Sequence, residues 1–179
     1  IFGHSIITEA HEVKKLINVS PQETAVAPNL SVRENLEFIA GIYGAKNPWE
    51  SASREIEEMG LSSVACKKAK TLSGGWQRRL SIAMALISEP KLLFLDEPTL
   101  GLDVIARREL WNVIKKLRSR TTVILTTHYL EEAESLSDRI GIMSHGSLVA
   151  CGTAEELVAL SGKGNFEDAF VALAGGEKA

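Results

Sequence analysis

The chain has 179 residues, 45% of them hydrophobic and 24% charged, which is typical of one globular domain with a sizeable core. Its formal net charge is −3, so no overall positive field favours nucleic acid or an anionic membrane as the partner. The two cysteines, Cys66 and Cys151, lie far apart and outside any CxxC, which argues against a metal or disulfide framework and fits a reducing cytoplasm.

The first part of the chain predicts a strand followed by two helices. We expect the strand at 14–20 and the helices at about 31–43 and 50–59. Ser31 and Glu34 have the spacing of a capping box at the start of the first helix, and a glycine follows the second.

The middle of the chain alternates between helices and short apolar strands. A helix at 76–88, with its apolar residues on one side, precedes a strand at 92–95. A helix at 104–119 then precedes a strand at 122–127. Because the first strand is wholly apolar and the second has an apolar centre, we expect both to be buried in a parallel sheet, built from right-handed βαβ units in an α/β fold.

The last part predicts helices around one hairpin. An acidic helix is expected at 130–137, and the runs on either side of His145–Gly146 predict a β-hairpin at 139–151. A second capping box starts a helix at 153–160, and a final helix is expected at 166–174.

Two carboxylates, Asp96 and Glu97, directly follow the strand at 92–95. Ligands of open α/β sheets bind at the carboxyl ends of the strands, and a carboxylate pair there needs solvent, a partner or a cation. Asp96 could face a Mg²⁺ and Glu97 could orient a water molecule. Taken alone, an acidic turn before Pro98 is the simpler interpretation.

Other polar residues stand at ends of predicted elements. His128 ends the next strand and could reach a terminal phosphate or an attacking water, although a lone histidine is more often structural. Gln22 follows the first strand and could bind Mg²⁺ through its amide oxygen, and it fits an ordinary loop equally well. Asp103 is expected to cap the helix at 104–119.

The stretch Ser73-Gly74-Gly75 opens a helix without a side chain that would block an approaching group. Backbone N–H groups and the positive end of the helix dipole attract anions there. Ser73 could therefore donate to a phosphate, or it could simply cap the helix.

In their order, these motifs resemble those of the ATP-binding cassette (ABC) ATPases. VSPQ resembles the Q-loop, LSGGWQRRL the signature loop, LLFLDEPT the Walker B strand, LGLD the D-loop and TTH the switch histidine. The match runs from about residue 14 to the C-terminus. It implies a P-loop NTPase-like α/β core with a parallel sheet plus an α-helical subdomain. The segments would be a helical subdomain at about 29–88, a core at 1–28 and 89–152, and C-terminal helices at 153–179.

The resemblance implies an ATPase that uses ATP and Mg²⁺. Asp96 and Gln22 would contact Mg²⁺, and Glu97 would polarise the attacking water as general base. Gln22 would also contact this water, and His128 would hold it in line with the γ-phosphate. Positioning and charge neutralisation would supply most of the catalysis.

The resemblance also implies partners. Two cassettes would face each other, with Ser73, Gly74 and Gly75 binding the γ-phosphate held by the opposite cassette and Asp103 crossing the interface. A helix of a membrane permease would dock on the helical region, which places the protein at the cytoplasmic face of a membrane and involves no nucleic acid. The C-terminal stretch resembles cassettes of exporters.

Two features depart from the family pattern. Trp76 stands where glutamine is usual, and no G-x-x-x-x-G-K-[ST] occurs in the 179 residues. In the family this P-loop precedes the Q-loop, so we expect it upstream of Ile1 together with the first strands. We therefore expect a truncated cassette that neither binds ATP tightly nor hydrolyses it alone, and whose sheet exposes an apolar edge and face.

Two alternatives remain open. The chain could be a non-catalytic half-cassette that lends its signature loop to a partner ATPase, or a soluble ABC ATPase without a transport role. The presence of Gln22, Glu97 and His128 argues against the first, because a purely structural module has no need of them.

Overall fold

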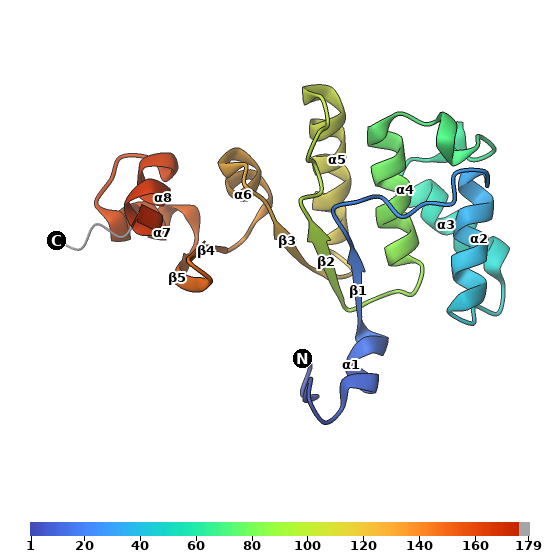
Figure 1. The fold of residues 1–179 in the computed structure, drawn as a ribbon, viewed down its shortest axis with the longest axis horizontal. Helices are drawn as coiled ribbons and strands as arrows, with labels where there is room; N and C mark the ends of the chain where they lie inside the picture. The colour runs from blue at the N-terminus through green and yellow to red at the C-terminus, as the bar shows by residue number, and fades with distance from the viewer. Residues whose placement is uncertain (176–179) are drawn as a thin grey trace. The chain divides into compact units, whose positions relative to one another are not determined.

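A computed structural model describes residues 1–175, which form two compact units (Figure 1). The first unit is Ile1–Thr126, and the second begins at Thr127. Residues 176–179, the end of the expected C-terminal segment, lie outside the described residues. Within the described part, no helix is long and apolar enough to cross a membrane.

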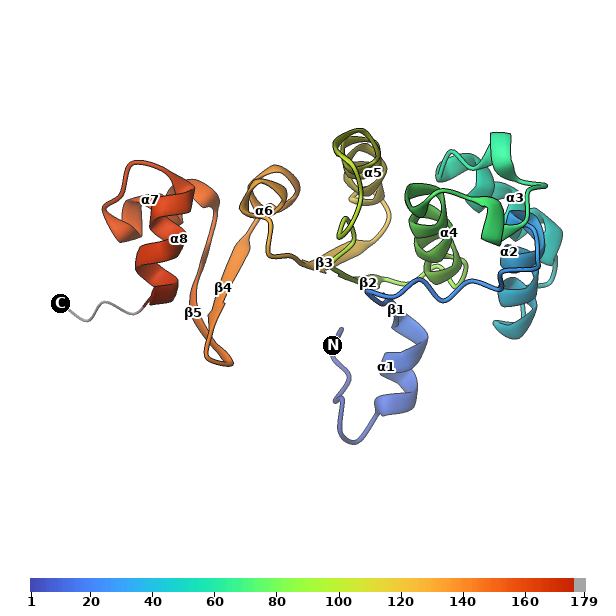
Figure 2. The same cartoon turned by 45° about the horizontal axis from the view of Figure 1, so that its top comes forward.

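The first unit is built on a parallel sheet, as predicted. The strands β1 (Ile17–Ser20), β2 (Leu92–Asp96) and β3 (Thr122–Thr126) pair in that order. Figure 2 shows α4 (Gly74–Leu86) and α5 (Val104–Leu117) together on one side of the strands. On the covered side the sheet buries Leu93 and Leu95, which are at most 1% exposed.

The helical region forms as expected between β1 and α4. It contains α2 (Val32–Ile42) and α3 (Pro48–Glu58), which pack against each other and against α4. The predicted capping box starts α2: the Glu34 carboxylate accepts from the Ser31 N–H at 2.7 Å, and the Ser31 hydroxyl accepts from the Glu34 N–H at 3.2 Å. Two short 3₁₀ turns lead into α4, at Ser62–Val64 and Ala69–Thr71.

The prediction of a strand at 14–20 is wrong for residues 14–16. These belong to α1 (Ala10–Leu16), and only β1 is extended. The Lys15 ammonium binds the Glu12 carboxylate at 2.8 Å across one turn, and Val13 is buried. Over so short a window the apolar alternation does not distinguish a strand from one helical turn, and Lys-Lys-Leu favours the helix.

Helix α4 lies at the centre of the first unit. It starts two residues earlier than predicted because Ser73 occupies the N-cap position. The expectation of one apolar side is wrong, since α4 contacts α2, α3, α5 and the sheet and buries residues around most of its circumference. A helix placed in this way must bury its polar residues too, and Arg78, Arg79 and Ser81 are all at most 9% exposed.

The strand β3 was expected to be buried, and it is largely exposed. Val19, Phe94 and Ile124 form one row across the sheet by their register, and Val19 and Ile124 are 49% and 47% exposed. Among the described residues of the first unit, the helices α4 and α5 cover the opposite face. The predicted exposure of an apolar sheet face is therefore confirmed.

The second unit packs helices against a hairpin. It contains α6 (Leu130–Leu136), the antiparallel strands β4 (Ile140–Ser144) and β5 (Ser147–Gly152), α7 (Ala154–Ser161) and α8 (Phe166–Gly175). Each matches its predicted counterpart within two residues. Five buried apolar residues of this unit form a cluster: Ile140, Ile142, Ala150, Leu157 and Phe166.

A buried ion pair ties the helical region to the turn before β3. Glu55 of α3 is 0% exposed, and its two carboxylate oxygens accept from the Arg120 guanidinium at 3.1 and 2.9 Å. Burial raises the pKa of the Glu55 carboxyl, although the hydrogen bonds and charge of Arg120 lower it in part.

This raised pKa predicts a pH-dependent stability difference between the chain and the variant Glu55→Gln. The folded state binds a proton at Glu55 more readily than the unfolded state does. The proton therefore stabilises the folded state, and this contribution to the unfolding free energy is complete below the ordinary glutamate pKa, about 4.3. The contribution is lost as the pH rises through the raised pKa that Glu55 has in the folded state. Urea unfolding should therefore show Glu55→Gln gaining stability relative to the parent chain between about pH 4 and pH 7; a relative loss would contradict the raised pKa.

Candidate functional site

The two predicted carboxylates stand at the carboxyl end of β2, and Thr126 of β3 holds both residues in place. The Thr126 hydroxyl donates to Asp96 Oδ1 at 2.5 Å. The Glu97 N–H donates to the Thr126 carbonyl at 3.1 Å and approaches the Thr126 hydroxyl at 3.2 Å. Asp96 is exposed and Glu97 half-buried, so a ligand from solvent can reach this end of the sheet.

Glu97 adopts a backbone conformation that non-glycine residues rarely take. Its φ is +43°, in the left-handed region, whereas the preceding strand is extended. Such a conformation costs about 1–3 kcal/mol, persists only where the surroundings enforce it, and clusters at functional sites. Glu97 directly follows the last residue of β2, so its left-handed conformation changes the direction of the chain at the point where the strand ends.

Gln22 lies in the loop after β1, and the structure brings this loop to the same end of the sheet. The connection is Arg78, whose guanidinium donates to the carbonyl oxygens of Gln22 at 3.1 Å and Asp96 at 2.5 Å. Sequence reasoning did not find Arg78. No local pattern marks it, because its acceptors lie in segments that are distant in the sequence.

The predicted anion-binding loop opens α4 as expected. Ser73 is the exposed N-cap residue, but its side chain makes no capping hydrogen bond. Asp103 does cap α5, as predicted: its Oδ1 accepts from the N–H groups of Ile105 and Ala106, both at 2.9 Å. Gly74 faces the D-loop, where an added Cβ would lie 3.8 Å from Leu102 Cδ2. The signature loop and the D-loop therefore lie side by side.

Gly75 has a packing role that the sequence did not reveal. A Cβ at this position would lie 3.1 Å from the Cβ of Ala106 on α5, closer than most such contacts. The missing side chain lets α4 and α5 approach each other. A ligand can therefore approach the helix start at Gly74, which is exposed, more easily than at Gly75.

This difference predicts opposite effects of the same substitution at two neighbouring glycines. Gly75→Ala should cost unit 1 about 1 kcal/mol, because overpacking of about 1–3 kcal/mol is partly offset by better helix propensity. Gly74→Ala should leave stability unchanged or raise it by up to about 1 kcal/mol. Urea unfolding followed by tryptophan fluorescence measures both, since all three tryptophans lie in the first unit. Equal losses would contradict the packing role.

Trp76, which departs from the family pattern, packs against its own helix. The Arg79 guanidinium lies 4.8 Å from the centre of the Trp76 ring, in cation–π geometry. Arg79 also donates to the Glu109 carboxylate of α5 at 2.6 Å. Trp76 therefore packs on Arg79, the residue that joins α4 to α5.

His128 lies in the second unit, two residues beyond the end of β3. It is exposed, and its ring stacks beside that of Tyr129 with 4.2 Å between ring centres. Its expected role toward a γ-phosphate stays a prediction.

The donor set fits a Mg²⁺ that is bound together with phosphate. Within residues 1–175, no three His, Cys, Asp or Glu side chains gather as a metal cage. Mg²⁺ usually takes only one or two carboxylates from the protein and completes its shell with water and phosphate oxygens. Asp96 is an exposed carboxylate at the end of β2, and Arg78 joins its backbone to the loop of Gln22.

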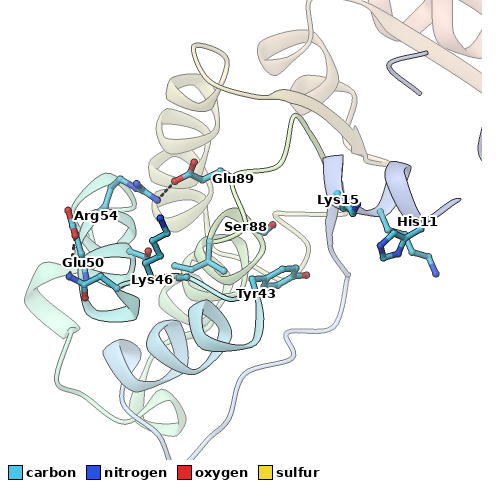
Figure 3. A pocket seen from close by; sticks show the side chains of 13 residues that line it. His11, Lys15, Tyr43, Lys46, Glu50, Arg54, Ser88 and Glu89 are labelled. Carbon is cyan, nitrogen blue, oxygen red and sulfur yellow. Dashed lines mark hydrogen bonds and ion pairs between the residues drawn. The ribbon is translucent and has the colours of Figure 1, made fainter. Parts of the chain in front are cut away.

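A separate cleft of about 830 Å³ opens in the first unit, away from the strand ends (Figure 3). Its lining combines the apolar side chains of Tyr43 and Ile87 with polar and charged ones. The charged residues of the lining are Lys14, Lys15, Lys46, Arg54, Glu50 and Glu89. Four are basic and two acidic, so the cleft carries a net positive charge, and in Figure 3 Arg54 is joined to Glu89 across its edge.

Comparisons with known proteins show the family of the chain. A sequence profile described as ABC transporter matches residues 2–100. The "Daunorubicin resistance ATP-binding protein DrrA3" of Streptomyces coeruleorubidus is 41% identical over 165 residues, covering 90% of this chain and 52% of the relative. The human "Phospholipid-transporting ATPase ABCA3" is 38% identical over 158 residues, covering 86% of this chain and 9% of that protein.

A solved structure supports the fold independently. The chain matches a "Structure of ATP binding subunit of ABC transporter" with a TM-score of 0.79 and 24% identity, covering 97% of this chain and 74% of that one. The chain spans about half the length of the two daunorubicin-resistance relatives it matches, at 52% and 48%.

Proposed function

This chain belongs to the ABC transporter family, and from that premise we propose that it supplies the ATP-hydrolysing chemistry of an exporter cassette. Members of this family hydrolyse ATP in general. The exporter assignment is supported by relatives named as drug-resistance ATP-binding proteins and by one named as a phospholipid-transporting ATPase.

The observation that carries this proposal is the anchored pair of carboxylates at the end of β2. Bound ATP supplies the phosphoryl group, and Mg²⁺ neutralises its charge. Asp96 and Gln22 hold the metal ion. Glu97 accepts the proton of the attacking water, while Gln22 and His128 orient that water. Thr126 holds the Asp96 carboxylate and the Glu97 backbone N–H, which supports the positioning that this catalysis requires.

A second cassette is the proposed partner at the start of α4. Ser73 keeps its hydroxyl out of the helix cap, and Gly74 is exposed, so a phosphate held by the opposite cassette can approach the helix N-terminus. Gly75 contributes its N–H. Asp103 crosses the interface from the neighbouring D-loop while also capping α5.

No G-x-x-x-x-G-K-[ST] motif, the usual phosphate cradle, occurs in the 179 residues. We infer that these residues alone do not hydrolyse ATP. The chain joined to a P-loop-bearing segment from a similar cassette is called the complemented ATPase below.

A membrane permease is the proposed second partner, docked through the cleft of Figure 3. Large apolar side chains of the helical region face solvent, and Tyr43 among them also lines the cleft: Phe38 at 60%, Ile42 at 63%, Tyr43 at 54% and Trp49 at 61% exposure. A helix from the permease would cover them. This partner would hold the protein at the cytoplasmic face of the membrane.

Steady-state hydrolysis by the complemented ATPase tests the proposed function. We expect phosphate release from ATP that requires Mg²⁺ and stops when the metal is chelated by EDTA, because the site offers too little charge of its own to stabilise the transferred group. No hydrolysis, or hydrolysis that is indifferent to Mg²⁺, would contradict it.

A further inference from the structure

Arg78 is a cation in the interior of the first unit. It lies on the second turn of α4, one turn after the signature glycines, and is 4% exposed. A buried guanidinium is costly unless its N–H groups are hydrogen-bonded. The positions of its acceptors therefore show which parts of the chain it holds.

The acceptors we find are main-chain carbonyl oxygens from two loops. Arg78 Nε donates to Pro98 at 3.0 Å, and Nη2 donates to Asp96 at 2.5 Å. Nη1 donates to Gln22 at 3.1 Å and also to Pro21. The fork is planar and rigid, so it fixes both the distance and the direction of these carbonyls relative to α4.

Two of these acceptors stand on either side of Glu97. Asp96 and Pro98 flank the residue with the φ of +43°, and the Glu97 N–H is held from the other side by Thr126. Arg78 and Thr126 together enforce the strained turn. Without the fork of Arg78, the backbone at Glu97 can relax toward an ordinary conformation, and its carboxylate moves with it.

We propose that Arg78 is the positioning residue of the hydrolytic site, which sets the backbone of Glu97 and of Gln22 by hydrogen bonds from the signature helix. The consequence for hydrolysis rests on the proposed function above, but the effect on the backbone does not. Lysine keeps the charge but has one nitrogen in place of the fork, so it cannot hold both loops.

Amide hydrogen exchange of the ligand-free 179-residue chain tests the backbone effect. In Arg78→Lys we expect exchange to become about tenfold faster or more in peptides covering 19–24 and 95–102, with no change in peptides from α2 and α3. The matched control is Arg79→Lys, which changes the next arginine on the same helix, also buried but bound to Glu109. It should leave both loops unchanged.

Two results would overturn the proposal. One is unchanged exchange in both loops of Arg78→Lys. The other is faster exchange throughout the first unit, or loss of the fold, which would make Arg78 an ordinary core residue.

Turnover separates positioning from binding. In the complemented ATPase, Arg78→Lys should lower kcat by about 10- to 100-fold with little change in KM, because misplacement of a catalytic group affects the chemical step. Combined with Glu97→Gln it should lower kcat by less than it does alone, since Arg78 acts in part through Glu97; fully additive losses would contradict this route. Because the exchange experiment needs no nucleotide, it decides the backbone effect even if the complemented ATPase proves inactive.

Discussion

Replacing Glu97 by glutamine lowers the ATP turnover of the complemented ATPase by about 10²- to 10⁴-fold, the usual contribution of a general base. Glutamine has nearly the same shape, so the backbone at this position keeps its hydrogen bonds to Thr126. The hydrogen bonds from Arg78 to the flanking carbonyl oxygens are kept as well. It cannot accept the proton of water. Binding of Mg-ATP should therefore stay close to that of the parent protein, and single-turnover measurements should place the loss in the chemical step.

The matched control is Glu57→Gln, which makes the same chemical change at an exposed position of α3. It should leave turnover unchanged. If Glu97→Gln retains full turnover, or if it loses Mg-ATP binding in parallel with turnover, Glu97 does not act as the base.

Replacing Arg120 by methionine lowers the unfolding free energy of the first unit by about 3 kcal/mol. The variant leaves the fully buried Glu55 carboxylate without its two hydrogen bonds, and a broken buried pair costs about 3–5 kcal/mol. We expect the lower end of that range because the Arg120 side chain is 29% exposed. The Arg54 Nε lies 3.9 Å from the same carboxylate, so its charge offsets only part of this loss.

Two companions of Arg120→Met separate the pair from general effects on the helix. Lys116→Met, at an exposed position of α5, should change stability by at most about 0.5 kcal/mol. The double variant Glu55→Leu with Arg120→Met should recover most of the lost stability, because apolar replacement of a buried pair is often neutral. Urea titrations followed by tryptophan fluorescence give all three values. A loss of stability in the double variant equal to that in Arg120→Met would contradict the cost of the unpaired charge.

Features set by neighbouring residues could be predicted from the sequence. The capping boxes of α2 and α7 and the Asp103 cap of α5 each depend on residues within one turn, and all three form as expected. The parallel pairing of β2 with β3 also follows from the pattern, because two short apolar strands joined by an amphipathic helix have few alternatives.

Features set by distant segments could not be predicted in the same way. The acceptors of Arg78 lie 18 to 57 residues away in sequence, so no local pattern contains them. The exposure of Ile124 depends on which side of the sheet the helices cover, whereas the composition of β3 shows only that the strand can be buried. The close packing against Ala106 of α5 explains why position 75 is a glycine, and the glycine-rich motif alone does not show this contact.

In the proposed function, these residues bind the metal ion and the attacking water of an ABC site but do not supply its phosphate cradle. Equilibrium titration of Mg-ATP onto the 179-residue chain and onto the complemented ATPase tests this proposal. We expect no saturable binding to the chain alone at concentrations up to about 1 mM, and a Kd in the micromolar range for the complemented ATPase. Micromolar binding by the chain alone, or no binding by the complemented ATPase, would contradict this division of the site.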